Sequence, residues 1–308
     1  MAAAFTTDKA RRRGLLGVLL LFVTTLFWGG GFVAQLWGAN HLGPAAVICF
    51  RSVLAVLFLL GVQAVRRRNG FTRRTWTYGS ICGVSLFVPM YAQQHAFDLG
   101  VTPGVCAFLT ANYILLVPVI GAFIGRRASW VEWAALVPAL VGTYFICVTG
   151  GESFAVGLGE LWSLACAALF AVEILVVDRF APGIDTIAFS AVSFAVCALC
   201  ALPFMFFMAE SAQVTWANVS AAFPSLLYLG LGSSGVGYTL QNVAQGMGTP
   251  PAPAAIVMSL ESVFGVLFGW MFCQEVLSGR CLGGCLLVFV AVLAVALAPL
   301  CLSRKGEC

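Results

Sequence analysis

Hydrophobic runs, each separated from the next by a short polar or Gly/Pro-containing break, fill this chain from residue 15 to residue 302. A helix needs roughly 20 apolar residues to cross a bilayer core about 30 Å thick, and each run has about that length. Ten membrane-spanning helices are therefore predicted, over residues 15–37, 44–65, 76–98, 103–124, 130–149, 157–178, 184–208, 222–245, 250–273 and 280–302. The pattern predicts an all-α polytopic membrane protein with no separate soluble domain.

Composition supports this interpretation. The 308-residue chain is 61% hydrophobic and only 9% charged, with a mean hydropathy of +1.00. A soluble domain carries about 25% charged residues, so most of this surface faces lipid. The first run is too long for a signal peptide and is predicted to be a retained helix. Most of the 12 cysteines lie inside hydrophobic runs, where cysteine acts as a small apolar residue. No disulfide framework, metal or cofactor is predicted.

Basic residues gather on one side of the predicted bundle. With the N-terminus inside, 14 of the 16 fall on the cytoplasmic side. They are Lys9, Arg11, Arg12, Arg13, Arg66, Arg67, Arg68, Arg73, Arg74, Arg126, Arg127, Arg179, Arg304 and Lys305. The positive-inside rule then predicts that both termini lie in the cytoplasm. The predicted location is the plasma membrane, which would be a bacterial inner membrane. Because topology explains the basic runs, no nucleic-acid partner is predicted.

The chain contains an internal repeat. Two polar sets with the spacing i, i+3, i+4, i+7 lie 147 residues apart, and a Thr-Pro pair follows each. They are Tyr91, Gln94, His95 and Asp98, and Tyr238, Gln241, Asn242 and Gln245. Two five-helix units are predicted, at 15–149 and 157–302, between cytoplasmic tails at 1–14 and 303–308. Since five is odd, the second unit is inverted, as in transporters that hold substrate near the bilayer midplane.

Each polar set occupies one helical face, where amides would lack partners if they faced hydrocarbon. In the predicted topology the first set lies in the outer half of its helix and the second in the inner half. The two sets are therefore predicted to line a pathway as alternating gates. The alternative is that both anchor helix ends at the membrane interface.

Ionisable residues at membrane depth are further candidates, because such charges are costly and commonly face a cavity. Glu261 lies deep in its run, and an offset of 149 residues pairs it with Asn112. Glu261 is predicted to bind an ammonium group or a proton, or else to join helices as a polar contact. Arg51 is predicted to bind a substrate carboxylate or to serve a structural role. Candidates for an aromatic wall, as opposed to simple packing, are Trp28, Tyr113 and Trp162.

Several motifs then resemble a known family. Leu26–Ala34 is similar to its opening WG-x-x-F-x-A motif, Phe50-Arg51 to its arginine motif, and Ser259–Phe264 followed by Phe272–Ser278 to its SLEPVF…LGERLS hairpin. These are marks of the drug/metabolite transporter superfamily, EamA type, and the resemblance covers essentially the whole chain. It implies ten helices around a central cavity and the export or exchange of amino acids, metabolites or drugs. Ser262 replaces the family's proline, which predicts a straighter helix there.

The sequence therefore predicts a secondary transporter that moves small metabolites, amino acids or drug-like compounds by alternating access, in efflux or exchange. Its partners would be the bilayer, a small-molecule substrate, and a proton or counter-substrate; monomer and homodimer stay open. A passive channel or an importer is the alternative. A membrane-embedded enzyme is a remote one, because no catalytic motif is present.

Overall fold

The computed structural model describes residues 2–125, 128–147, 157–207, 209–274, 276 and 278–304. Every regular element in these ranges is helical. The first half contains α1 (Ala2–Ala39), α2 (Pro44–Arg66), α3 (Arg73–Asp98), α4 (Pro103–Ala111), α5 (Tyr113–Phe123) and α6 (Trp130–Cys147). The second contains α7 (Leu158–Phe180), α8 (Thr186–Phe207), the short η1 (Ala209–Gln213), α9 (Trp216–Leu227), η2 (Tyr228–Tyr238), α10 (Thr239–Gly246), α11 (Pro251–Met258), α12 (Glu261–Cys273) and α13 (Gly279–Arg304).

Four of these elements, α5, η2, α10 and α12, continue the preceding element with little or no break, so the described residues form ten long helical rods apart from η1. The rods α4–α5, α9–η2–α10 and α11–α12 are composite. Seven rods of the described chain are long and apolar enough to cross a membrane by length and composition. Arg126, Arg127, residues 148–149, residue 208 and the tail from residue 305 onward lie outside the described residues.

Helix starts largely follow local sequence signals. Proline occupies the first turn of α2, α4 and α11, where its missing N–H is not needed and its fixed φ suits a helix. The eighth rod begins at Trp216, six residues before the predicted start, because the Thr215 side chain accepts a hydrogen bond from the Asn218 N–H. Residues 2–14 of the predicted N-terminal tail form the first part of α1, which begins at Ala2.

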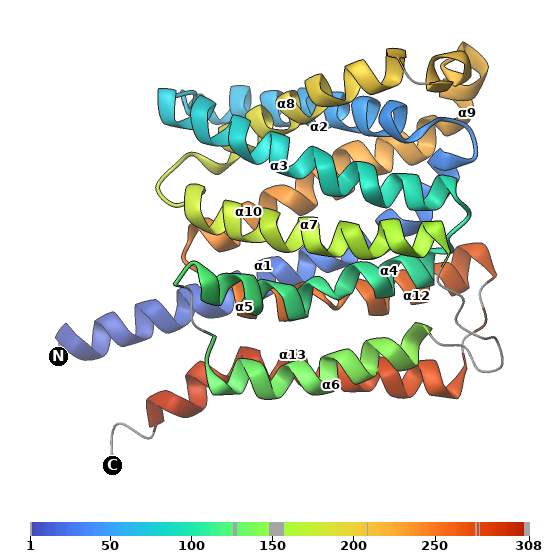
Figure 1. The fold of residues 1–308 in the computed structure, drawn as a ribbon. Coiled ribbons are helices and arrows are strands. Elements are labelled where there is room, and N and C mark those ends of the chain that lie inside the picture. The colour runs from blue at the N-terminus through green and yellow to red at the C-terminus, as the bar shows by residue number, and fades with distance from the viewer. Residues whose placement is uncertain are drawn as a thin grey trace.

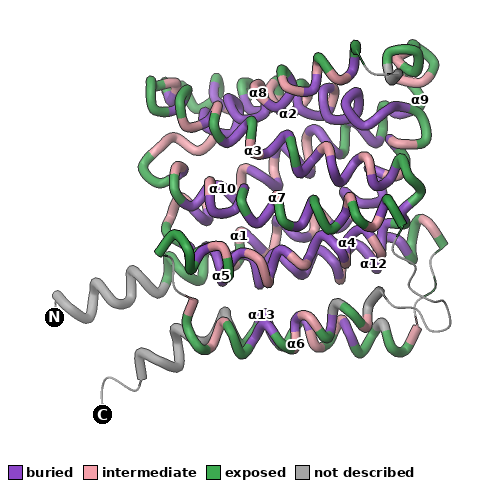
Figure 2. Tube along the Cα trace, in the orientation of Figure 1, coloured by how far each residue is buried: buried purple, intermediate pink, exposed green. Residues whose placement is uncertain are grey.

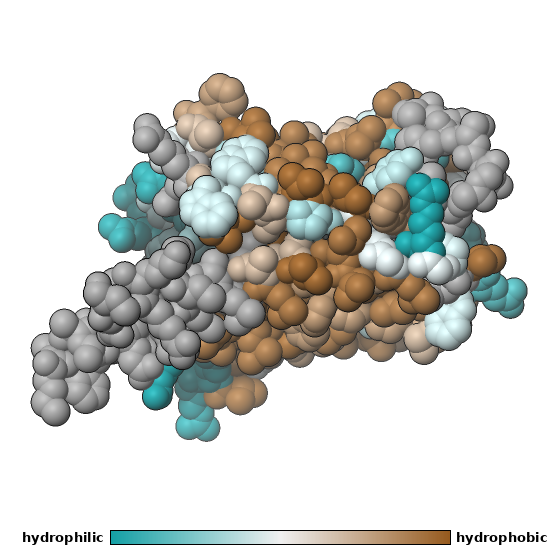
Figure 3. Space-filling model, turned by 90° about the horizontal axis from the view of Figure 1, so that it is seen from below, coloured by the Kyte–Doolittle hydropathy of each residue, from teal (hydrophilic) through white to brown (hydrophobic). Residues whose placement is uncertain are grey.

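The rods run across the bundle in alternating directions, and α1 begins and α13 ends on the same side (Figure 1). The α2–α3 and α7–α8 loops lie on that side too. Buried positions face the bundle interior (Figure 2). The face seen in Figure 3 is hydrophobic in its middle, with hydrophilic groups toward its ends. This is the surface expected of a multi-pass membrane protein.

Two composite rods are interrupted within two residues of the positions, Asn112 and Glu261, that the offset of 149 residues pairs with each other. Asn112 separates α4 from α5, and Ser259 and Leu260 separate α11 from α12. The second interruption thus occurs just before Ser262, although the family's proline is absent there. The Ser262 N–H bonds to the Ser259 carbonyl three residues back, and its hydroxyl donates to the same oxygen at 2.7 Å. Such back-bonding by serine tightens and bends a helix without proline.

The eleven residues of η2 form a π-helix, which is wider than an α-helix. Long π-helices are rare, and short ones concentrate at functional sites. Four of the eleven residues are Gly230, Gly232, Gly235 and Gly237, which lower the cost of an unusual backbone path. The segment lies inside the bundle against α1 and α2.

Close packing of α3 on α8 gives a first prediction. A Cβ at Gly83 would collide with the backbone oxygen of Ser193. Gly83→Ala is expected to destabilise the folded protein by about 1–3 kcal/mol, because backbone contacts cannot yield as a flexible side chain can. Thermal unfolding in detergent, followed by tryptophan fluorescence, measures the change. Gly61→Ala on α2, where a Cβ would meet nothing within 4 Å, is the matched control and should lose no stability. Equal losses in both variants would contradict the proposed tight contact.

Candidate functional site

A small cavity lies at the centre of the bundle, between residues of both halves. The volume that the centre of a water molecule can occupy inside it is about 30 Å³. This volume is enough for about two water molecules. Aromatic side chains form much of its wall: Trp28, Phe32, Tyr113, Phe170 and Tyr238. Polar and charged side chains complete most of the rest: Gln35, Arg51, Gln93, Glu173, Ser233, Gln241 and Glu261. Charged groups buried at this depth are costly unless they bind a ligand or pair with one another.

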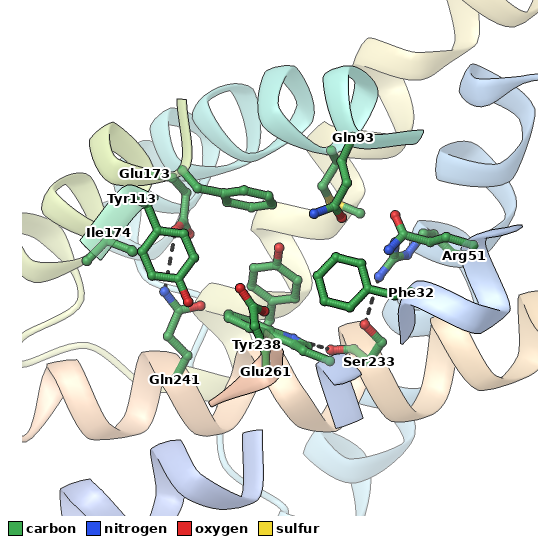
Figure 4. Close-up of a pocket in the computed structure, with 14 residues that line it drawn as sticks. Phe32, Arg51, Gln93, Tyr113, Glu173, Ile174, Ser233, Tyr238, Gln241 and Glu261 are labelled. Carbon is green, nitrogen blue, oxygen red and sulfur yellow. Dashed lines mark hydrogen bonds between the residues drawn. The ribbon is translucent and has the colours of Figure 1, made fainter. Parts of the chain in front are cut away.

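Arg51 lies at one end of the cavity and Glu173 at the other (Figure 4). Arg51 is 3% exposed. Its Nη2 donates to the Ser233 hydroxyl and its Nε to the Ser234 hydroxyl, both at 3.0 Å. Both partners are neutral, and no described carboxylate forms an ion pair with Arg51. The guanidinium therefore keeps an uncompensated positive charge beside the cavity.

The wide η2 helix supplies both serine partners and is held to α1 by three hydrogen bonds from side chain to backbone. Trp28 Nε1 donates to the Ser233 carbonyl at 3.2 Å, and Thr24 Oγ1 donates to the Gly237 carbonyl at 3.2 Å. In the reverse direction, the Tyr228 hydroxyl donates to the Phe27 carbonyl at 3.1 Å. Because these bonds reach backbone oxygens of η2 and α1, they hold the π-helical path as well as the side chains on it.

Glu173 is 3% exposed. Gln241 Nε2 donates to its Oε2 at 3.4 Å and to Gln245 Oε1 at 3.1 Å. Gln245 Nε2 in turn donates to the Ile174 carbonyl at 2.9 Å. This chain of amides fixes the position of Glu173. Sequence reasoning missed Glu173 as a site residue, although its place inside a hydrophobic run was a usable signal.

Glu261 opens α12 and Tyr113 opens α5, so the two helix interruptions bring both side chains to the cavity. Four buried polar atoms of the cavity wall lack a hydrogen-bond partner among the described residues. They are Gln35 Oε1, Gln241 Oε1, Glu261 Oε1 and the Tyr113 hydroxyl, of which the last two belong to neighbouring side chains that interact with each other. Buried polar atoms are seldom left unpaired, so these point to a ligand or water that the cavity holds. Three of the four are acceptors, which favours a ligand rich in N–H or O–H donors.

The structure brings six of the predicted site residues together. Those that line the cavity are Trp28, Arg51, Tyr113, Tyr238, Gln241 and Glu261. Those that do not are Tyr91, Gln94, His95, Asp98, Asn112, Trp162, Asn242 and Gln245. On α3 the lining residues are Met90 and Gln93, each one position before a residue of the predicted set. A shift of one residue turns the face of a helix by about 100°.

The residues outside the cavity serve helix contacts instead. Gln94 Nε2 donates to the Gln35 carbonyl at 3.0 Å, and Asn242 Nδ2 to the Ser190 hydroxyl at 2.9 Å. Asn112 Nδ2 donates to two carbonyls of α4 at its C-terminal end, those of Phe108 and Leu109. His95 stacks on Tyr91 and meets Trp162 edge to face, with ring centroids 6.0 and 5.1 Å apart.

The two tyrosines of the predicted gates therefore differ in position, which gives a second prediction. Tyr238 packs on Trp28 with ring centroids 4.6 Å apart at the cavity, whereas Tyr91 packs on Phe87 and Phe204. Tyr238→Leu is expected to lower transport by about tenfold, since a lost aromatic pair is worth up to about 1.5 kcal/mol. Tyr91→Leu, the matched control, should change it by less than about threefold when its contacts serve packing alone. Initial transport rates at equal protein amounts measure both, and equal losses would restore the two-gate interpretation.

An all-helical membrane bundle that encloses a polar, charged chamber is the arrangement of a solute transporter. The chain belongs to the EamA-like transporter family, whose sequence pattern matches it twice, over residues 15–148 and 157–297. The predicted family resemblance is confirmed, and the protein is a multi-pass membrane transporter and no enzyme.

Similar proteins agree with this assignment. An uncharacterized transporter of Archaeoglobus fulgidus is 26% identical over 281 residues, covering 90% of this chain and 84% of that protein. The uncharacterized transporter YwfM of Bacillus subtilis is 23% identical over 290 residues, covering 93% of this chain and 96% of that protein. A solved crystal structure superposes with a TM-score of 0.75 at 19% identity, over 95% of this chain and 99% of the other. That likeness shows the fold.

Proposed function

We propose that this protein is a secondary transporter that moves a small organic solute by alternating access through the central cavity. The observation that carries the proposal is a buried chamber with a cation at one end, an acid at the other and unpartnered acceptor atoms between. All ten rods would cross the membrane as two inverted units, with both termini in the cytoplasm of a bacterial inner membrane. The arginine-rich loops on the side of the chain ends support this orientation.

The charges favour a substrate that carries both an ammonium group and an anionic group, such as an amino acid or a similar metabolite. Arg51 would receive the anionic group, because its charge has no described carboxylate partner. Glu173 and Glu261 would receive the ammonium group, with Gln35 and Gln241 as further acceptors. Aromatic walls suit either an apolar side chain or the face of a cation.

The small volume of the cavity favours a carrier over a passive channel. Space of about 30 Å³ is too small for such a solute, so the two halves would separate to admit it. The helix interruptions at Asn112 and at Ser259–Leu260 meet this cavity from opposite halves and supply bending points. Since no Walker motif is present, the driving force would be an ion gradient or exchange, with efflux or exchange as the direction.

Counterflow in proteoliposomes tests the proposal. Vesicles that contain the purified protein are loaded with one unlabelled amino acid or amine at a time and diluted into a trace of the labelled compound. A carrier accumulates label transiently inside, whereas a channel only equilibrates it. Transient accumulation with at least one dipolar solute, absent from protein-free vesicles, is expected. Equilibration without overshoot for every permeant solute would contradict the carrier and support the channel.

A further inference from the structure

A second concave site, which shares no lining residue with the central cavity, lies between the α2–α3 loop and the α7–α8 loop. The groove has a volume of about 350 Å³. Arg68, Asn69 and Thr72 line it from the first loop, Arg74 from the first turn of α3, and Asp185 from the second loop. We propose that this groove binds the phosphate headgroup of an anionic membrane lipid such as phosphatidylglycerol.

The groove carries a net positive charge that the structure leaves available. Five arginines occur between residues 66 and 74. The single carboxylate among the lining residues, Asp185, is already engaged: Arg66 Nη1 lies 3.2 Å from both of its oxygens, and the Ala188 N–H donates to it. Arg68 and Arg74 form no ion pair with any carboxylate in the described parts of the chain. Two arginines therefore line the same groove, and neither is ion-paired within the described parts of the chain.

The walls of the groove are fixed by local hydrogen bonds rather than by the ligand. Gln63 Nε2 donates to the Arg68 carbonyl at 2.8 Å, and Thr75 Oγ1 donates to the Gly70 carbonyl at 2.7 Å. Thr72 caps the N-terminus of α3 through the Thr75 N–H. Gly70 lets the two loops approach, because a Cβ there would lie 2.7 Å from the Cβ of Asp185. A preformed groove loses less conformational entropy when it binds a ligand.

The surroundings of the groove favour a lipid as the source of the phosphate. Trp76 is 54% exposed and packs on Phe71 with ring centroids 6.1 Å apart. Exposed tryptophan beside arginine is typical of the interface between lipid tails and headgroups. Guanidinium groups bind phosphate oxygens through paired, charge-assisted hydrogen bonds. Topology alone requires basic residues on this side, but it does not require them to line a shaped groove closed by a second loop.

Native mass spectrometry of the full-length protein in detergent tests this site. Purified protein is titrated with phosphatidylglycerol and, separately, with phosphatidylcholine of the same chains. The groove variant is Arg68→Ala/Arg74→Ala. The matched control is Arg73→Ala/Arg179→Ala, which removes two exposed arginines from the same side outside the groove. Wild type and control are expected to prefer phosphatidylglycerol, and the groove variant to bind it at least about tenfold more weakly.

Equal phosphatidylglycerol binding by all three proteins would overturn the proposal, as would an equal loss in the control. If the alanine variant does not fold, Arg68→Gln/Arg74→Gln provides the same comparison with longer polar side chains. Inorganic phosphate at millimolar concentration distinguishes the two sources of the ligand. Lipid that stays bound in its presence supports a headgroup site, whereas release by phosphate indicates a site for soluble phosphate and overturns the lipid assignment. None of these outcomes depends on whether the protein transports a dipolar solute.

Discussion

Replacing Glu173 with glutamine is expected to lower counterflow of an ammonium-bearing solute by about 10- to 100-fold. Glutamine has nearly the same shape, and its amide oxygen can still accept the hydrogen bond from Gln241. Only the negative charge is lost, and a hydrogen bond to a charged group contributes about 1.5–3 kcal/mol. Initial rates over a range of substrate concentrations measure the change.

Glu160→Gln is the matched control, because Glu160 belongs to the same helix. It lies at the first turn of α7, where its carboxylate accepts a bond from the Gly157 N–H, outside the cavity. Transport should be nearly unchanged in that variant. Glu261→Gln tests the second acid in the same way and is expected to show a loss like that of Glu173→Gln. If only Glu261→Gln loses activity, the ammonium contact belongs to the centre of the cavity and the role assigned to Glu173 is wrong.

Much of the fold could be predicted from the sequence because its signals are local. Run length, loop breaks and prolines at helix starts identified the ten rods to within a few residues in most cases. The start of the eighth rod was predicted too late because the hydrophobic signal is weak there. The N-cap at Thr215 marks the true start instead. The helix interruptions fall where the repeat offset pairs Asn112 with Glu261, although the sequence alone did not show that the helices break there.

The candidate site was harder to predict because it depends on which face of each helix turns inward. The polar set on α3 was chosen by spacing, yet the cavity is lined by the neighbouring face with Gln93. A periodicity of 3.6 residues also cannot anticipate η2, whose π-helical path brings Ser233 and Tyr238 to the cavity. Predicting Glu173 as a site residue would have required knowing that its carboxylate contacts the amide of Gln241, which lies 68 residues later in the sequence.

Replacing Arg51 with glutamine is expected to change which solutes the protein carries as well as how fast it carries them. Transport of a solute with both an ammonium and a carboxylate group should fall by about 100-fold or more, since two charge-assisted hydrogen bonds are lost. The corresponding amine without a carboxylate should lose far less. The ratio of the two rates, measured in the same vesicles, therefore reports the contact between Arg51 and the carboxylate. Arg280→Gln is the control: Arg280 lies over the rings of Tyr144 and Phe145, with its guanidinium carbon 5.5 and 5.1 Å from their centroids.

A purely structural role for Arg51 makes a different prediction, because its hydrogen bonds also hold η2. Ser233→Ala/Ser234→Ala removes both of these bonds and leaves the charge in place. If Arg51 acts only by holding η2, this double variant should reproduce the Arg51→Gln defect, with both solutes slowed alike. If Arg51 binds the carboxylate, the double variant should keep the preference for the dipolar solute, because the freed guanidinium can still reach it. The preference ratio thus separates the two roles even where both variants transport slowly, since a change in η2 affects every solute and a lost carboxylate contact affects only one.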